Sequence, residues 1–447
     1  MKLLTRRAAV LLFIVLLMIQ GLGVFTYRYM TNAPQWARHY SNKHLYAQGA
    51  PLVSGTIYDR NGQILFQIEN GQASYHEDRS VRTALMHAVG NGRGDVATSA
   101  QVLYQARLLG WDFVNGAYRF NNQVAHSMSD VTLTLDAELC DVAYAALNGR
   151  KGTVGVYNYK TGEILCMVSS PSYDPENPPD IEYSQERYEG VYMNRLLSAT
   201  YTPGSVFKLV TAAAAIDQVD GLKGQVFHCD GEEMIDGDLV TCPEVHGDVD
   251  FEQALASSCN IAFAEITLQV GAESLQQYAD KTGMTEGLKF DGITTAAGNV
   301  EAWKAKGADL AWAGIGQSSD TVNPLNFMAY MGAVANEGVS VRPKLIPSST
   351  VKKDKLISKE TANELKLLMR NNVQSGYGEY RYEGLELCAK TGTAETGATT
   401  RPHAWFAGFL DREDYPLAFV VVVENGGSGI GAAAPVAAKV LKAAVVD

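Results

Sequence analysis

A serine and a lysine three residues apart have the residue types and the spacing of an activated nucleophile. Ser205 and Lys208 lie in the segment 203–208 (PGSVFK), directly ahead of the Ala-rich apolar run 209–216. The turn residues before Ser205 and the apolar run behind it predict a buried helix that begins at or just before this serine. A serine at a helix start lies near unpaired backbone N–H groups, and we expect the amine of Lys208 to reach its oxygen. A nucleophile, a base and donors for an oxyanion would then lie together.

The Ser-x-x-Lys spacing alone does not distinguish this chemistry from a serine that only caps a helix. A second copy, Ser349 and Lys352, lies in a loop rich in Pro, Ser and Lys with no predicted helix start. Another polar pair, Ser258 and Asn260, opens an apolar helix predicted over 261–270. Its alternative role is again helix capping, so the remaining segments have to decide between the two interpretations.

The tripeptide Lys-Thr-Gly occurs three times, and two of the copies are best interpreted as structural turns. At Lys160 the tripeptide forms the turn of a hairpin predicted over 154–157 and 163–169. At Lys281 it ends a predicted helix, with Gly283 as the C-cap.

The third copy differs because it follows both other polar segments and carries a second threonine. Lys390 ends a strand predicted from the alternation of Leu385, Leu387 and Ala389, and Thr391, Gly392 and Thr393 come next. The alternative for Lys390 is an exposed lysine on an edge strand.

The elements that must position these residues indicate an α+β domain with a mainly antiparallel sheet flanked by helices. Asn61-Gly62 between two apolar runs predicts a hairpin. A helix capped by Asp136 is predicted over 136–147. We predict further strands over 131–135, 404–409 and 417–423, a helical region around 99–109 and a closing helix over 434–444.

Composition and charge limit the size of the domains and the kind of partner that this chain can have. With 447 residues and 46% hydrophobic residues, the chain has room for a large globular domain and a smaller one. The formal net charge of −12 argues against nucleic acid as the main partner.

The N-terminus predicts a single transmembrane helix. Lys2, Arg6 and Arg7 precede an uncharged stretch over 8–25. That length is sufficient for one span, and the basic residues favour a cytoplasmic N-terminus with the rest of the chain outside. A cleaved signal peptide is the alternative. We therefore divide the chain into a short cytoplasmic tail and anchor (1–28), a stalk with a small pedestal or dimerisation-like domain (29–130), and a large domain (131–447).

Six cysteines occur in this exported chain. Cys229 and Cys242 lie in one Gly/Asp-rich segment and could close a short covalent loop, whereas the other four are expected to be buried thiols. We find no Cys-x-x-Cys or His-x-x-x-His pattern. The sequence therefore predicts no metal and no cofactor. His246 is interpreted as a loop residue, because Lys208 already supplies the base.

Three segments resemble, in this order, the motifs of penicillin-binding proteins and serine β-lactamases: 205–208 (SVFK), 258–260 (SCN) and 390–393 (KTGT). The segment 55–62 (GTIYDRNG) is similar to the N-terminal signature of class B penicillin-binding proteins, except that Ser54 stands where that signature usually has Arg. The region 67–130 carries no motif of that family. The following stretches resemble the class B transpeptidase domain: 171–175 (PSYDP), 194–195 (NR), 316–317 (GQ), 324–325 (PL) and 405–408 (WFAG).

The resemblance implies a peptidoglycan D,D-transpeptidase that acts on stem peptides and is inhibited covalently by β-lactams. Ser205 would attack the carbonyl between two D-alanines, with Lys208 as general base. Burial and a neighbouring Lys390 would keep Lys208 partly neutral. Ser258 would relay the proton to the leaving amine, and Asn260 would hold a substrate amide.

Lys390, Thr391, Gly392 and Thr393 would form the substrate-binding strand, with the lysine and the hydroxyls on the terminal carboxylate. The backbone N–H groups of Ser205 and Thr393 would form the oxyanion hole. A membrane-embedded glycan polymerase is the partner that this family implies.

Three alternatives remain at this point. A serine β-lactamase would need a Glu or a modified lysine to activate water, and no such Glu can be identified in the sequence. A D,D-carboxypeptidase would use water as acceptor. A non-catalytic β-lactam sensor or scaffold would usually carry more cytoplasmic chain than the seven residues before Ala8.

Overall fold

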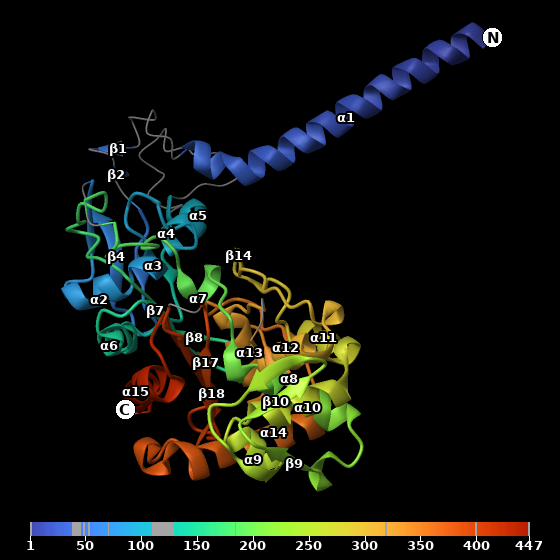
Figure 1. Cartoon of the computed structure of the whole chain (residues 1–447). Coiled ribbons are helices and arrows are strands. Elements are labelled where there is room, and N and C mark those ends of the chain that lie inside the picture. The colour runs from blue at the N-terminus through green and yellow to red at the C-terminus, as the bar shows by residue number, and fades with distance from the viewer. Residues whose placement is uncertain are drawn as a thin grey trace.

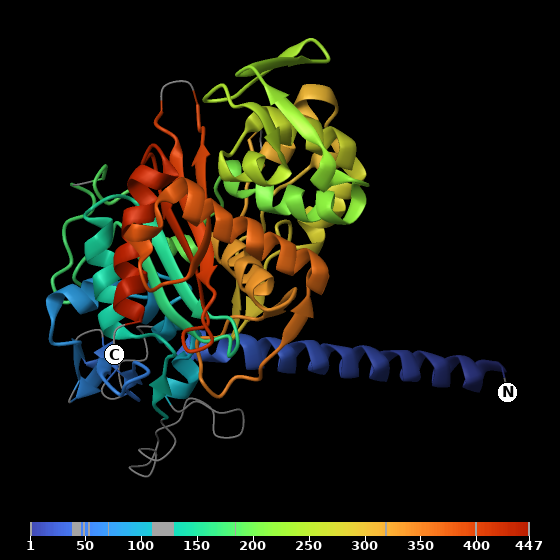
Figure 2. The same ribbon diagram turned by 90° about the horizontal axis from the view of Figure 1, so that it is seen from below.

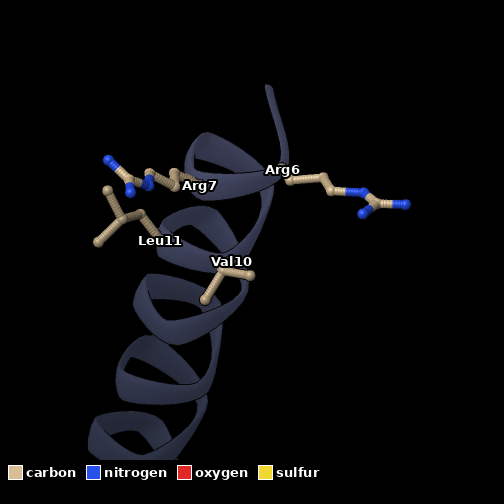
Figure 3. A pocket seen from close by; sticks show the side chains of 4 residues that line it. All are labelled: Arg6, Arg7, Val10 and Leu11. Carbon is tan, nitrogen blue, oxygen red and sulfur yellow. The ribbon is translucent and has the colours of Figure 1, made fainter. Parts of the chain in front are cut away.

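A long N-terminal helix, α1 (Lys2–Ala37), projects away from the remainder of the chain in the computed structural model (Figure 1). Its segment Arg6–Asn32 is long and apolar enough to cross a membrane, as predicted. Figure 3 shows Arg6 and Arg7 pointing outward at the start of this segment. The helix continues past residue 28, so residues 29–37 of the expected stalk are helical. The structure describes residues 2–37, 46–47, 50–51, 54–69, 71–109, 129–183, 185–317, 320–397 and 400–445.

A five-stranded antiparallel sheet in the order β17-β18-β19-β7-β8 forms the centre of the molecule. The valine-rich β19 is buried along its whole length, as expected for a central strand covered on both faces. The sheet lies between a layer containing α6 and α15 and a larger helical layer (Figure 2). The bounds are β7 (Gly152–Asn158), β8 (Ile164–Ser170), β17 (Leu387–Ala394), β18 (His403–Leu410), β19 (Leu417–Val423), α6 (Ala137–Leu147) and α15 (Ala434–Ala444).

The predicted mainly antiparallel sheet with flanking helices is therefore confirmed. So are the closing helix and the helix capped by Asp136, whose carboxylate accepts a hydrogen bond from the backbone of Leu139. Two predictions are wrong: the strand expected over 131–135 covers only Val131–Thr132, and the site strand does not end at Lys390. β17 continues to Ala394, because the whole 390–394 stretch pairs with β18.

The larger helical layer is built around the Ala-rich helix α8, which packs against α10, α11, α12 and α14. Small alanine side chains let these helices approach α8 closely, and α8 is buried over most of its length. α13 lies between this layer and the central sheet. The bounds are α7 (Arg195–Ser198), α8 (Lys208–Gln218), α10 (Asn260–Val270), α11 (Ala272–Lys281), α12 (Gly307–Ile315), α13 (Pro324–Ala335) and α14 (Lys359–Asn371).

Two small antiparallel ladders lie beside this layer and end close to α10. β9 pairs with β12, and β10 pairs with β11. The short helix α9 follows β12 and leads toward Ser258. The bounds are β9 (Val226–Cys229), β10 (Glu232–Ile235), β11 (Asp238–Thr241), β12 (Gly247–Asp250) and α9 (Phe251–Ala256); the remaining short strands are β1 (Tyr46–Ala47), β2 (Ala50–Pro51), β13 (Lys289–Phe290), β14 (Ile293–Thr294), β15 (Val339–Val341) and β16 (Lys353–Lys355).

The N-terminal region forms a four-stranded sheet, β5-β4-β3-β6, with short helices. The predicted Asn61-Gly62 hairpin is confirmed: β3 and β4 are antiparallel, and Gly62 takes a φ of 83° in the turn. Residues 70 and 110–128 of the expected small domain lie outside the described residues. The bounds are β3 (Ile57–Tyr58), β4 (Ile64–Glu69), β5 (Gln72–Tyr75), β6 (Val131–Thr132), α2 (Arg79–Ala84), α3 (Met86–Val89), α4 (Ala100–Leu103) and α5 (Gln105–Leu109).

Candidate active site

Ser205 lies in a tight 3₁₀ turn (Gly204–Val206) that leads into α8, close to the predicted helix start. The turn is held against β17 and the end of α12. Gly204 has a φ of 56°, and its N–H donates to the carbonyl of Gly316 at 2.8 Å. A Cβ at Gly204 would lie 2.6 Å from the carbonyl oxygen of Thr393. Only glycine therefore allows the serine turn to approach the 390–394 segment this closely.

Lys208 begins α8 and is fully buried. Its Nζ donates to the carbonyl oxygen of Ser258 at 2.6 Å and to Oδ1 of Asn260 at 2.8 Å. The Ser258 Oγ is 3.4 Å away. We expected the amine to reach Ser205, but none of its hydrogen bonds within the described residues goes to that serine. The two strong acceptors on the Ser258–Asn260 side explain this orientation.

The Ser258 and Asn260 side chains do not cap α10. Cys259 is the N-cap, and its Sγ accepts from the N–H of Ala262 at 3.5 Å. Ser258 has a φ of 59°, a left-handed conformation that is strained for a serine and is concentrated at functional sites. Its Oγ accepts from Lys390 Nζ at 2.9 Å. The capping interpretation is therefore wrong for both residues.

Lys390 lies on the edge strand β17, yet its side chain is completely buried. Besides Ser258, its Nζ donates to the carbonyl of Thr391 at 3.2 Å. The interpretation as an exposed edge lysine is therefore wrong. Lys208 and Lys390 approach Ser258 from two different elements, so the three predicted segments meet at this one hydroxyl.

Burial controls the charge of both amines. It lowers the pKa of Lys390 to about 7. Burial also holds the pKa of Lys208 well below its usual range, and the neighbouring charge of Lys390 lowers it further. Within the described part of the chain, no Asp or Glu forms an ion pair with either lysine. Neutral amines are therefore accessible near neutral pH, as proton acceptance requires.

The three residues after Lys390 have different surroundings. Thr391 contacts Tyr377, whose Oη lies 3.2 Å from both its backbone N and its Oγ1. Gly392 is buried, and a Cβ there would lie 2.8 Å from the carbonyl oxygen of Pro203. Thr393 is exposed, and its carbonyl accepts from Gln317 Nε2 at 3.1 Å. Gly392 therefore allows close packing, whereas Thr391 is half-buried and Thr393 is exposed.

Sequence reasoning did not assign roles to Tyr377 or Gln317. Gln317 also accepts from the N–H of Glu395 at 3.2 Å, so it bridges two positions on β17 and the segment after it. Its only sequence signal was the Gly-Gln pair at 316–317. Tyr377 ends a π-helical segment (Asn372–Tyr377) and had no signal, because its contact with Thr391 joins two separate elements.

The rejected copies lie elsewhere. Lys160 is exposed in the hairpin turn between β7 and β8, as predicted. Lys281 ends α11, and Gly283 follows with a φ of 81°. Ser349 donates to Asp291.

Cys229 and Cys242 are both free cysteines, so the covalent loop considered for them is not formed.

Comparison with known proteins identifies the family of this chain. The family model of the penicillin-binding protein transpeptidase domain matches residues 152–442. The peptidoglycan D,D-transpeptidase PbpA of Mycolicibacterium smegmatis is 30% identical over 334 residues, which cover 66% of this chain and 67% of that protein.

Two solved structures share the fold. The D,D-transpeptidase domain of a peptidoglycan glycosyltransferase from Eggerthella lenta has a TM-score of 0.72 at 26% identity, covering 88% of this chain and 98% of that one. The imipenem acyl-enzyme complex of penicillin-binding protein A from M. tuberculosis has a TM-score of 0.74 at 25% identity, with the same coverage. The chain belongs to the penicillin-binding protein transpeptidase family.

Proposed function

We propose that this protein is a peptidoglycan D,D-transpeptidase that cross-links stem peptides through an acyl-enzyme on Ser205. β-Lactams would acylate the same serine. The observation that carries the proposal is the meeting of two buried amines, Lys208 and Lys390, at the Ser258 hydroxyl beside the Ser205 turn. Relatives named peptidoglycan D,D-transpeptidases and acyl-enzyme complexes of family members support it.

Lys208 is the proposed general base. A neutral amine has two N–H groups and one lone pair. The two short hydrogen bonds to Ser258 O and Asn260 Oδ1 use both N–H groups, so the lone pair is left to accept a proton. The Ser258 Oγ at 3.4 Å is the third contact of this Nζ, and the Ser205 hydroxyl would take its place during proton transfer. Burial makes the neutral form available.

The proposed roles of the remaining groups rest on the same contacts. The Ser205 Oγ–carbon bond forms and the bond to the terminal D-alanine nitrogen breaks, while Ser258 passes the proton from Lys208 to that nitrogen. Asn260 would hold a substrate amide. Protonated Lys390 and the hydroxyls of Thr391 and Thr393 would bind the terminal carboxylate, and Gly392 keeps this strand against the serine turn.

The Ser205 and Thr393 N–H groups are the proposed oxyanion donors, because the Gly204 turn contacts Thr393 so closely. In the second half of the reaction the amine of a neighbouring stem peptide attacks the acyl carbon. The new peptide bond forms and the Ser205 Oγ–carbon bond breaks, while Lys208 takes the proton from the amine and returns it to the Ser205 oxygen.

Amine transfer is favoured over hydrolysis. Within the described residues, no carboxylate hydrogen-bonds to Ser205, Lys208, Ser258 or Lys390. A serine β-lactamase with a Glu base would need such a group to activate water, so the acyl-enzyme is expected to be long-lived.

We also infer that α1 anchors the protein in the cell membrane with its N-terminus in the cytoplasm. The two arginines at the start of the apolar segment support this orientation. The large domain (131–447) would then lie outside the cell membrane, and the small N-terminal domain would support it as a pedestal. A membrane-embedded glycan polymerase is the proposed partner, and co-purification of the detergent-solubilised full chain with such a polymerase would test it.

The central test is intact-mass spectrometry of the full-length protein in detergent, incubated with penicillin and followed over hours. We expect one adduct on Ser205 that persists. Ser205→Ala should give no adduct and unchanged circular dichroism. Ser349→Ala, in the second Ser-x-x-Lys copy, is the matched control and should label like the wild type.

Other outcomes would contradict the proposal. An adduct lost within seconds would indicate a β-lactamase. No adduct would favour the scaffold interpretation, and labelling that survives Ser205→Ala would place the nucleophile elsewhere.

A further inference from the structure

Three cysteines and one histidine meet beside the candidate active site. They are Cys229, Cys242, His246 and Cys259, and their side-chain ligand atoms all lie within 4.8 Å of one another. All three cysteines are free. Cys229 and Cys259 are buried, and the other two are partly buried. The reaction proposed for Ser205 uses none of the four.

The distances agree with one ion held at a tetrahedral centre. Bonds of about 2.3 Å to sulfur and about 2.0–2.1 Å to nitrogen place sulfur and nitrogen ligands about 3.5 Å apart. His246 Nδ1 lies 3.6 Å from Cys229 Sγ and 3.4 Å from Cys242 Sγ. The imidazole nitrogen therefore already lies at the required separation from two sulfurs.

Four separate segments bring these ligands together. Cys229 ends β9, and Cys242 directly follows β11. His246 directly precedes β12, whose first residue, Gly247, pairs with Cys229. Cys259 is the N-cap of α10. The two ladders and the helix thus fix the ligands without a local Cys-x-x-Cys motif.

Backbone donors are already directed at two of the sulfurs. The N–H of Asn260 donates to Cys242 Sγ at 3.2 Å, and the N–H of Ala262 donates to Cys259 Sγ at 3.5 Å. Both donors belong to the first turn of the eleven-residue helix α10, whose N-terminus favours negative charge. Such donors stabilise thiolates, the form in which cysteine binds a metal.

We propose that Cys229, Cys242, His246 and Cys259 bind one structural Zn²⁺ ion. Three thiolates and one imidazole in a tetrahedral, closed set are typical of structural zinc sites. The expectation of no metal came from the absence of a short motif, whereas His246 was interpreted as a loop residue because Lys208 already supplied the base.

The site has a direct consequence for the active site, because Cys259 lies between Ser258 and Asn260. The Asn260 Nδ2 donates to the carbonyl of Thr241, the residue before Cys242, at 2.9 Å. Its Oδ1 accepts from Lys208. Zinc bound to Cys242 and Cys259 would therefore hold the Ser258–Asn260 segment in the position that Lys208 and Lys390 require.

Metal content is the first measurement. The full-length protein, purified in detergent under reducing conditions from zinc-containing medium, should carry about one zinc per chain by plasma mass spectrometry. Cys242→Ser and His246→Ala should each lose most of it. His228→Ala, an exposed histidine one residue before Cys229, and Cys388→Ser, a buried cysteine on β17, are matched controls that should keep it.

A measurement on the wild type covers the case in which a variant fails to fold. Exchange of the bound ion for Co²⁺ should give thiolate charge-transfer absorption and the strong visible bands of tetrahedral cobalt. A protein without zinc and without these bands would overturn the site. So would a Cys229–Cys242 disulfide in the freshly purified protein, or equal zinc in the variants and the controls.

Removal of zinc with a chelator should lower the unfolding temperature and slow acylation of Ser205 by roughly tenfold, the loss typical of a disturbed supporting shell. Readdition of Zn²⁺ should restore both. The acylation readout rests on the proposed function, whereas the zinc content and the cobalt spectrum do not. A zinc-loaded protein that penicillin never labels would therefore contradict the proposed function and leave the metal site standing.

Discussion

Two copies of the tripeptide Lys-Thr-Gly occupy opposite environments in this molecule. The copy at Lys160 forms an exposed hairpin turn, where the amine donates to Asn336 Oδ1 at 2.7 Å. The copy at Lys390 lies inside a strand, and its amine is completely buried against Ser258. The same three residues thus have an exposed lysine in one place and, in the other, a buried amine whose pKa is lowered to about 7.

Burial of Lys390, and not the motif, creates its chemistry, because desolvation penalises the charged form of an amine. The two copies can therefore serve as matched controls for one another.

The largest expected difference concerns the two lysine side chains. Lys390→Ala should slow penicillin acylation by about 100-fold or more, because it removes the charge for the carboxylate and a partner of Ser258. Lys160→Ala should leave the rate unchanged and alter the free energy of unfolding by no more than about 0.5 kcal/mol. Stopped-flow acylation and urea unfolding measure the two effects. Equal acylation rates for both variants would contradict a role for Lys390 in acylation.

The two active-site lysines should give acylation a characteristic pH dependence. Lys208 must be neutral, so acylation should rise with pH through its lowered pKa; Lys390 must be cationic, so acylation should fall as the pH rises through about 7. The second-order rate constant for a carboxylate-bearing β-lactam should therefore decline on the alkaline side. Lys390→Arg should remove that decline, because a guanidinium stays charged. A rate that still rises well above neutral pH would contradict a cationic role for Lys390.

Alanine variants of the two motif glycines should distinguish an effect on the free energy of unfolding from an effect on the acylation rate. A Cβ at Gly392 would lie 2.8 Å from the carbonyl oxygen of Pro203, next to the serine turn. Gly162 has a φ of 82°, and a Cβ there would lie 2.4 Å from the carbonyl oxygen of Arg342. Each alanine variant should cost about 1–3 kcal/mol of unfolding free energy. Only Gly392→Ala should also slow acylation of the folded protein; a slow Gly162→Ala variant would show that the two regions are coupled.

The smallest effect is expected at Tyr377, which contacts Thr391 of the active-site copy. Tyr377→Phe removes the hydroxyl beside Thr391 and should lower acylation about fivefold, the equivalent of about 1 kcal/mol. Tyr380→Phe is the control, because that tyrosine is 74% exposed. If both variants react at the wild-type rate, Tyr377 does not position Thr391.

Much of the fold could be predicted because local patterns determine it. The apolar run of β19, the Asp136 cap and the Asn61-Gly62 turn each specify an element within a few neighbouring residues. The end of the site strand was missed because Lys390 and the residues after it are polar or small. Only pairing with β18 shows that they continue β17.

The residue types, their order and the helix that follows Ser205 could be read from the sequence. The contacts between distant segments required the folded chain: Lys208 turns to Ser258 and Asn260, Lys390 is buried, and Cys259 meets Cys229, Cys242 and His246. The physical reason is that desolvation and ligand geometry depend on groups from distant segments. A linear pattern names these groups but does not set the distances between them.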